Sequence, residues 1–220
     1  INIFTVLPDN RLVSGSDDGS IRIWNTTTGQ CDNLFSIDDH GIQALASLAN
    51  GYLAFGSLSS RKIHLWDLEQ QAYAGFLHDP TYDDTEGIVL DKHPKRLQPS
   101  HIPGYSHDDG IGALLALPDG RLISGSKDKT IKVWPAEEGG AIHRLKAHTE
   151  EIHTLLLLPN GQLVSAAKHG VYLWDDLAIA SHTQILENST LIDALAVLPD
   201  GSLISYGITI NDETPQNGTF

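Results

Sequence analysis

The segment LPDGRLISGSKDKTIKVW, from Leu117 to Trp134, decides the fold because the chain repeats it. Similar segments occupy residues 7–24, 48–66 and 158–174, and a shortened one occupies residues 198–206. Measured between the equivalent residues Pro8, Ala49, Pro118, Pro159 and Pro199, the steps are 41, 69, 41 and 40 residues. A repeat of about 41 residues, interrupted once, therefore organises the chain, and such a period is typical of architectures in which similar units stack.

Each unit has the sequence pattern of short β-strands. An apolar run such as GIGALLAL (110–117) precedes the Leu-Pro pair, as expected for a strand buried on both faces. PDG or PNG then predicts a tight turn, RLISGS (121–126) an alternating second strand, and IKVW (131–134) a third strand rich in β-branched and aromatic residues. A weaker fourth strand follows. We therefore expect four-stranded antiparallel meanders, none of which can bury both faces without a neighbour.

These units resemble the WD40 repeat family, which builds β-propellers from repeats of about 40–45 residues. The third complete unit is the most specific, because a His precedes its inner strand and SGSKDKTIKVW (124–134) follows its first turn. The resemblance implies a hydrogen-bonded structural set formed by His107, Ser124, Asp128 and Trp134. Unit one keeps the Ser, Asp and Trp, and unit four keeps a His. The second turns of units two and four differ in length and lack the Asp.

The predicted fold is therefore all-β: a WD40-type β-propeller with four full four-stranded antiparallel blades and part of a fifth. We expect the four blades at about residues 1–40, 41–77, 110–147 and 151–187, and the partial blade at 191–220. The fifth unit shows only its first two strands and has no Trp at the expected position. Because open sheet edges invite aggregation, we interpret the chain as a portion of a larger propeller, with a divergent five-bladed ring as the alternative.

The interrupting segment, HDPTYDDTEGIVLDKHPKRLQPSHIPGYSHDD at 78–109, separates units two and three. Loops of this length without structure of their own are uncommon, and they are usually functional or disordered. The insertion carries Tyr82 and Tyr105, and tyrosine is enriched where proteins bind one another. The resemblance implies that this connection lies on the narrower face of the disc. Three interpretations remain open: a binding element that shapes that face, a surface decoration without a partner, and a partial extra blade edge.

The charge balance narrows the class of partner. The net charge is −14 and no cluster of Lys and Arg stands out, which argues against nucleic acid and anionic membranes. Protein or peptide partners with a basic patch are favoured. No apolar stretch approaches the roughly 20 residues that span a bilayer. The single Cys31 excludes an internal disulfide framework and, with no visible signal peptide, favours a cytoplasmic or nuclear location.

We expect no catalytic, cofactor or metal site. The histidines in or beside the insertion match no compact zinc pattern: His78, His93, His101 and His107. Paired carboxylates recur at turns, where Asp favours local hydrogen bonds to the backbone. On the inner strands, the polar candidates for a site near a central channel are Gln43, His153 and Asp193. A propeller hydrolase or lyase is therefore the least favoured alternative.

The favoured function is a non-catalytic scaffold that binds protein or peptide partners within a multiprotein complex. The family resemblance implies this class, since function resides in sites rather than in folds. The alternative is a substrate-docking or regulatory domain of a larger enzyme. We expect partners to contact loops of the presumed narrow face and of the insertion, and the candidate residues are Asp17, His40, Tyr82, Tyr105, Asp108, Lys127, Glu150 and Lys168.

Overall fold

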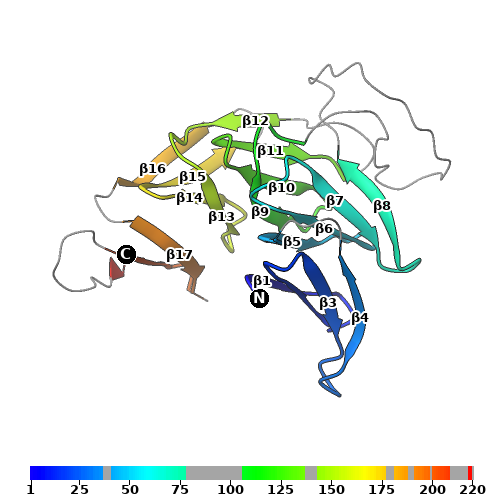
Figure 1. Ribbon diagram of the computed structural model, residues 1–220. Coiled ribbons are helices and arrows are strands. Elements are labelled where there is room, and N and C mark those ends of the chain that lie inside the picture. The colour runs from blue at the N-terminus through cyan, green and yellow to red at the C-terminus, as the bar shows by residue number, and fades with distance from the viewer. Residues whose placement is uncertain are drawn as a thin grey trace, which may run out of the picture.

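The computed structural model describes residues 1–36, 41–77, 106–136, 143–176, 181–187, 191–198, 200–208 and 218–219. These residues form β-strands and turns, grouped into antiparallel sheets that follow one another along the chain (Figure 1). The first two sheets consist of β1 (Ile3–Val6), β2 (Leu12–Gly15), β3 (Ser20–Trp24), β4 (Cys31–Ser36), and of β5 (Ala44–Ser47), β6 (Tyr52–Gly56), β7 (Ile63–Asp67), β8 (Ala72–Leu77).

Two further four-stranded sheets and a smaller one complete the described part. The four-stranded sheets consist of β9 (Ile111–Ala116), β10 (Leu122–Ser126), β11 (Thr130–Trp134), β12 (His143–Lys146), and of β13 (Ile152–Leu157), β14 (Leu163–Ala167), β15 (Gly170–Asp176), β16 (Ser181–Glu187). The last sheet consists of β17 (Leu191–Val197), β18 (Leu203–Ile208) and β19 (Gly218–Thr219). The predicted all-β fold, with four full blades and part of a fifth, is confirmed.

The fifth blade has one strand more than the sequence pattern predicts. The two residues of β19 pair with Ile204 and Ser205 of β18, although they carry neither the β-branched run nor the Trp of the other third strands. Pairing here depends on backbone hydrogen bonds and leaves little signal in the sequence. The inner strands of the five blades, β1, β5, β9, β13 and β17, are neighbours in that order, and Figure 1 shows the blades fanning out around them.

The first turn of each blade is held by the same local contacts. In the third blade, Gly120 has a φ of 90° and donates its backbone N–H to the carbonyl of Leu117. The side chain of Asp119 accepts a hydrogen bond from the backbone N–H of Arg121 at 3.1 Å. Asx side chains favour this kind of turn because they replace a backbone acceptor, which explains why the PDG sequence recurs. The turn fixes the register of the first two strands.

Neighbouring blades pack through a glycine and an isoleucine. A Cβ atom built on Gly125 of β10 would lie 2.5 Å from Cγ2 of Ile152, which begins the inner strand of the next blade. The same relation joins Gly15 to Ile42 at 2.5 Å and Gly56 to Ile111 at 2.6 Å. These glycines belong to the S-G or F-G pairs of the second strands. The absence of a side chain is therefore what lets one blade approach the next.

The two outer blades of the described arc each present one face that no neighbouring blade covers. Phe4 and Val6 occupy the register positions that Leu114 and Ala116 hold in the third blade, where those residues pack against the second blade. Phe4 is 67% exposed and Val6 is 57% exposed. In the fifth blade, Tyr206 stands at the position of the packing glycine and is also exposed. Apolar surface therefore remains accessible at both ends of the arc.

Candidate functional site

The four residues of the structural set meet in the third blade. His107 lies just before β9, Ser124 in β10, Asp128 in the turn between β10 and β11, and Trp134 at the end of β11. The Nε2 atom of His107 lies 2.6 Å from Oγ of Ser124, and its Nδ1 atom lies 2.8 Å from Oδ2 of Asp128. Trp134 donates its indole N–H to Oγ of Ser124 at 2.8 Å. The structure thus joins the loop that enters the blade to the three strands that follow.

The donors in this set determine where the protons lie. The indole N–H of Trp134 can only donate, so Ser124 accepts it and gives its own O–H proton to Nε2 of His107. The remaining imidazole proton is then on Nδ1 and is donated to Asp128. Thr130 adds a hydroxyl donor to the other carboxylate oxygen of Asp128 at 2.6 Å. Every polar group in the set is therefore satisfied, which is the condition for a buried network to stabilise a fold.

Burial sets the charge states of the pair. Burial lowers the pKa of His107, because it penalises the charged imidazolium more than the neighbouring carboxylate stabilises it. Burial alone raises the pKa of Asp128, but the hydrogen bonds from His107, Thr130 and the backbone of Asp108 outweigh it and hold that pKa far below the ordinary value. A neutral imidazole therefore faces an ionised carboxylate, which is a structural arrangement with no open position for a substrate.

The other blades keep parts of this set. In the first blade, Trp24 donates to Ser14 at 2.8 Å. In the fourth blade, Trp174 donates to Ser165 at 2.8 Å and His148 lies 2.6 Å from the same serine, but the shorter turn after β14 has no counterpart of Asp128. Burial lowers the pKa of His148 to about 4, and repulsion from His153 and His182 adds to the shift. The fourth-blade histidine is therefore neutral near pH 7.

The second blade has replaced the set by aromatic packing. Phe55 occupies in the second blade the position that Ser124 occupies in the third. The two residues are equivalent because they pair with matching positions of the third strands of their blades. The ring of Trp66 stacks on Phe35 of the first blade with centroids 3.7 Å apart. Among the described residues, Nε1 of Trp66 has no hydrogen-bond partner. At this position the second blade is therefore held by ring stacking instead of by the Trp–Ser hydrogen bond.

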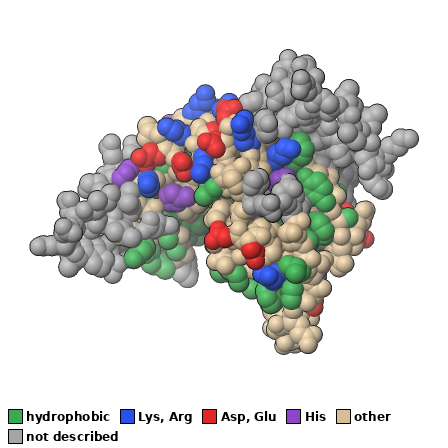
Figure 2. Space-filling model, viewed as in Figure 1, with side chains coloured by type: hydrophobic (Ala, Val, Ile, Leu, Met, Phe, Trp, Pro, Cys, Tyr) green, Lys and Arg blue, Asp and Glu red, His purple; other side chains and the backbone are tan. Residues whose placement is uncertain are grey.

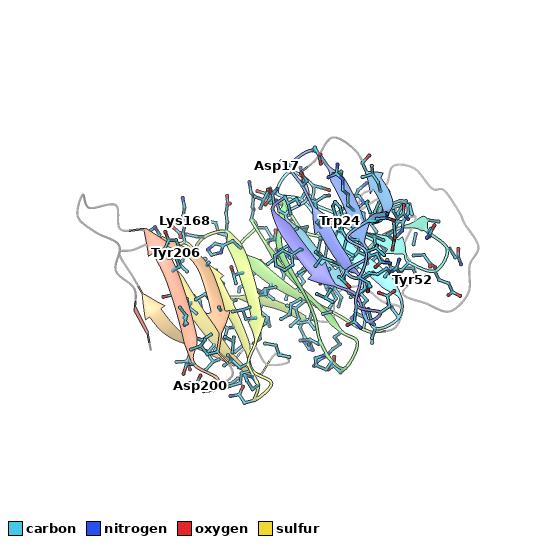
Figure 3. All side chains as sticks on the ribbon, turned by 90° about the horizontal axis from the view of Figure 1, so that it is seen from below. Asp17, Trp24, Tyr52, Lys168, Asp200 and Tyr206 are labelled. Atoms are coloured by element: carbon cyan, nitrogen blue, oxygen red, sulfur yellow. The ribbon has the colours of Figure 1, made fainter. Side chains whose placement is uncertain are left out.

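Three partner-binding candidates lie at equivalent turns. Asp17, Lys127 and Lys168 occupy the turns between the second and third strands of the first, third and fourth blades. Figure 3 shows Asp17 and Lys168 at one end of the blades, with Tyr52 and Asp200 toward the opposite end. Oδ1 of Asp17 accepts hydrogen bonds from Asn2 at 2.6 Å and from Gln43 at 3.1 Å. The structure therefore brings these turns to a common end of the blades and fixes the first one in place.

Two more candidates lie at the same end, just before inner strands. Asp108 precedes β9 and its carboxylate accepts a hydrogen bond from Arg144 at 2.9 Å. Glu150 precedes β13, and one of its oxygens lies 3.7 Å from Nε2 of His169. Both contacts are partly exposed, but Oε2 of Glu150 is buried and has no hydrogen-bond partner among the described residues. The remaining candidates, His40, Tyr82 and Tyr105, lie outside the described residues.

The end of the insertion is fastened to the second blade. The backbone N–H groups of Ser106 and His107 both donate to the carbonyl of Arg61, at 2.9 and 3.1 Å. The hydroxyl of Ser106 accepts the N–H of Ile63 and donates to the carbonyl of Leu77. Leu77, just before the insertion, and Ser106, near its end, are therefore in direct contact. Sequence reasoning missed this clamp, although the extra residue in the turn GSLSSRK (56–62) was a signal for it.

The described residues offer no clear site for other chemistry. No group of three or more His, Cys, Asp and Glu among them is arranged to hold a metal ion. Nor does the described part contain a helix that is both long and apolar enough to cross a membrane. Gln43 is engaged with Asp17, His153 lies 3.0 Å from the hydroxyl of Thr154, and the side chain of Asp193 lies outside the described part. Cys31 is an exposed free thiol on β4.

Comparison with known families agrees with this geometry. The family described as WD domain, G-beta repeat matches residues 2–25, 99–135 and 139–175. The chain belongs to the WD40 repeat family. The matched ranges fall on the first, third and fourth blades, which retain the Trp–Ser hydrogen bond, and omit the second, which has lost it. The family recognition made from the repeat is therefore confirmed.

Relatives and solved structures extend the likeness over the chain. Mitochondrial division protein 1 of Pyricularia oryzae is 30% identical over 154 residues, covering 63% of this chain and 22% of that protein. WD repeat-containing protein pop2 of Schizosaccharomyces pombe is 24% identical, covering 64% and 21%. The structure of U3-55K has a TM-score of 0.72 at 19% identity, covering 94% of this chain and 57% of that one. The matched part of this WD40 chain thus spans about a fifth of the length of these sequence relatives.

Proposed function

We propose that this WD40 chain is a protein-interaction scaffold that binds partners through the turns at the end of the blades where Asp17, Lys127 and Lys168 lie. The observation that carries the proposal is that these turns are equivalent in the repeat and are held firmly. The backbone N–H of Ile42 donates to the carbonyl of Ser16 and that of Ile192 to the carbonyl of Lys168, so the first and fourth turns are tied to the next blade, and the N–H of Lys127 ties the third turn to Gly110 of its own blade. A rigid frame that presents different side chains at equivalent turns suits recognition with little ordering cost.

The nature of the site supports a non-catalytic role. The His–Ser–Asp–Trp set of the third blade is buried and internally satisfied, so it acts on the fold and not on a substrate. The relatives are named for WD repeats or for mitochondrial division, and the WD40 family supports protein interaction in general. Binding at Asp17 and Glu150 favours a partner with a basic patch, and the interaction should weaken with salt.

The test is affinity capture from the source cell with matched charge-reversal variants. Asp17→Lys with Glu150→Lys changes the proposed binding end, whereas Asp32→Lys with Asp175→Lys changes exposed acids elsewhere by the same total charge. We expect the first pair to reduce capture of a specific partner about tenfold and the second pair to leave it within about twofold. Equal effects of the two pairs would show that the proposed end is not the binding surface.

The insertion is tested separately by deleting residues 80–104. Because Ser106 contacts Leu77 directly, a short linker can replace the deleted residues without separating the second and third blades. If the same deletion removes a specific partner while the thermal unfolding midpoint stays within a few degrees, the insertion belongs to the interface. Partners that persist without residues 80–104 would limit the interface to the turns.

A further inference from the structure

A group of basic side chains gathers where the third blade meets the clamp of the insertion. We define this basic corner as Arg61, Lys129, Lys132, Arg144 and Lys146. Lys132 and Arg144 are register partners on β11 and β12, and Lys146 pairs with Thr130, the residue after Lys129. Figure 2 shows several Lys and Arg side chains, with Asp and Glu side chains among them, along the edge of the molecule where Figure 1 draws β12. The corner is therefore built by neighbouring strands of one sheet and by the adjoining turn of the second blade.

Residues 106–108 hold the charged groups of Lys132 and Arg144 and the backbone of Arg61. The carbonyl of Arg61 accepts the backbone N–H of Ser106, and Nζ of Lys132 donates to the carbonyl of Ser106 at 2.8 Å. Arg144 donates to the carboxylate of Asp108, whose backbone N–H donates to Asp128 at 3.0 Å. Elements from both blades thus converge on three consecutive residues. The fully buried Lys132 anchors the group, while Arg61 and Arg144 remain exposed.

The charge of the basic corner is opposite in sign to the net charge of the chain. Its described acidic neighbours are Asp108, which pairs with Arg144, and Asp128, which is engaged with His107. The exposed Lys129 and Lys146 have no acidic residue within ion-pair distance among the described residues. The chain as a whole carries a net charge of −14. A local excess of positive charge on an otherwise acidic molecule attracts negatively charged groups to the basic corner.

We propose that the basic corner binds an acidic peptide segment of a protein partner, with the partner's carboxylates seated on Lys129, Arg144 and Lys146. Arg144 and Lys146 are two residues apart on β12, so their Cα atoms lie about 7 Å apart, which matches the i, i+2 spacing of an extended peptide. A nucleic acid is disfavoured because a long run of phosphates would meet the negative field of the whole chain. The inference deepens the proposed scaffold function, on which it rests, by naming the chemistry of one contact.

Binding of a fluorescein-labelled Asp/Glu-rich decapeptide to the whole chain, measured by fluorescence anisotropy, tests the proposal. Lys129→Asp with Lys146→Glu reverses two charges of the corner, and Asp is compatible with the φ of 69° at position 129. Arg11→Glu with Arg121→Glu reverses two charges at first turns, far from the corner in the repeat, and alters the net charge equally. We expect the first pair to weaken binding about tenfold and the second to change it less than about twofold.

Three results would overturn the proposal. The wild-type chain could bind a Lys-rich decapeptide or a ten-nucleotide single-stranded DNA as tightly as the acidic peptide. Both variant pairs could have the same affinity as the wild type. Removal of residues 80–104, which include four acidic residues, could tighten peptide binding about tenfold. That result would indicate that the insertion itself occupies the basic corner. A failure of the acidic-peptide proposal would not affect partner capture through Asp17 and Glu150. The experiments therefore distinguish the failure of one proposal from the failure of the other.

Discussion

Ser124 shows how one residue decides whether a blade is held by hydrogen bonds or by packing. Its hydroxyl accepts the indole N–H of Trp134 and donates to His107, so it links two buried groups that cannot bond each other directly. Where the second blade has Phe55 at this position, the Trp turns to aromatic stacking and its N–H has no partner among the described residues. The identity of this single residue therefore decides whether the Trp of a blade can form this hydrogen bond.

Substitution of Ser124 by Ala is expected to lower the free energy of unfolding by about 2–4 kcal/mol, because it leaves two buried polar groups unsatisfied. Ser14→Ala in the first blade serves as the control, since Ser14 accepts the N–H of Trp24 and no His lies among the described residues of that blade. We expect a loss of about 1 kcal/mol there. Urea unfolding followed by tryptophan fluorescence measures both, and equal losses would contradict the role assigned to His107.

His148 makes the stability of the fourth blade depend on pH. Its pKa is about 4 in the folded chain and 6.5 as the ordinary value, because burial penalises the charged ring. Between these values the unfolded chain binds a proton that the folded chain refuses, so stability is complete above about pH 6.5 and falls as the pH drops toward 4.

The expected cost of this titration at pH 4 is about 3 kcal/mol relative to pH 7. His148→Gln keeps an acceptor for the hydroxyl of Ser165 but does not titrate, so its stability should lack this component of the pH dependence. The measurement is the difference in unfolding midpoint between the variant and the wild type at several pH values from 7 to 4. A difference that stays constant over this range would show that His148 does not titrate as its burial requires.

At the scale of the elements, the sequence predicts contacts between residues that are close in the chain and misses contacts between residues that are far apart in it. The turns could be predicted because Asp119, Gly120 and Arg121 are adjacent and their contacts recur in each blade. The hydrogen bond from Ile63 to Ser106 joins residues separated by the insertion, so no short pattern encodes it. The strand β19 likewise pairs through its backbone and has no distinguishing side chains.

The candidate site could be predicted only in part. The candidate turns could be placed at one end of the blades because the repeat places them there. The basic corner could not be predicted, because it depends on the register between β11 and β12 in the folded chain.

Contact between blades depends on the glycine of the second strand. Gly125→Ala places a methyl group 2.5 Å from Cγ2 of Ile152, and we expect a loss of about 1–3 kcal/mol because β10 and β13 must move apart. Combining it with Ile152→Ala, which removes the opposing atoms, should give a smaller total loss than the sum of the two single substitutions. Urea unfolding of the four members of this cycle measures the coupling. Additive losses would indicate that Gly125 acts through its backbone and not through the blade contact.

At the scale of the whole molecule, one rule of packing explains both the buried and the exposed apolar residues. Each blade offers a face with a small residue to the next blade and receives an isoleucine from it. At one end of the arc, Phe4 and Val6 occupy facing positions without a described neighbour, and at the other end Tyr206 replaces the small residue and is exposed. Exposed apolar surface of this kind on a rigid sheet promotes association.

Reducing that surface on the first blade should change solution behaviour with little effect on stability. Leu34 lies on the same face as Phe4, because Phe4 pairs with Ser14, Ser14 with Arg22, and Arg22 with Leu34. Phe4 and Leu34 are 67% and 57% exposed, so replacing both by Gln removes apolar area without opening a cavity. We expect binding of a hydrophobic fluorescent dye to fall roughly twofold and light scattering on concentration to decrease. Leu58→Gln is the control, because Leu58 is an exposed apolar residue in the turn after β6 and not on the open face. An equal fall in the control would place the dye elsewhere, whereas a fall confined to Phe4 and Leu34 would identify the open face as the main accessible apolar surface of the chain.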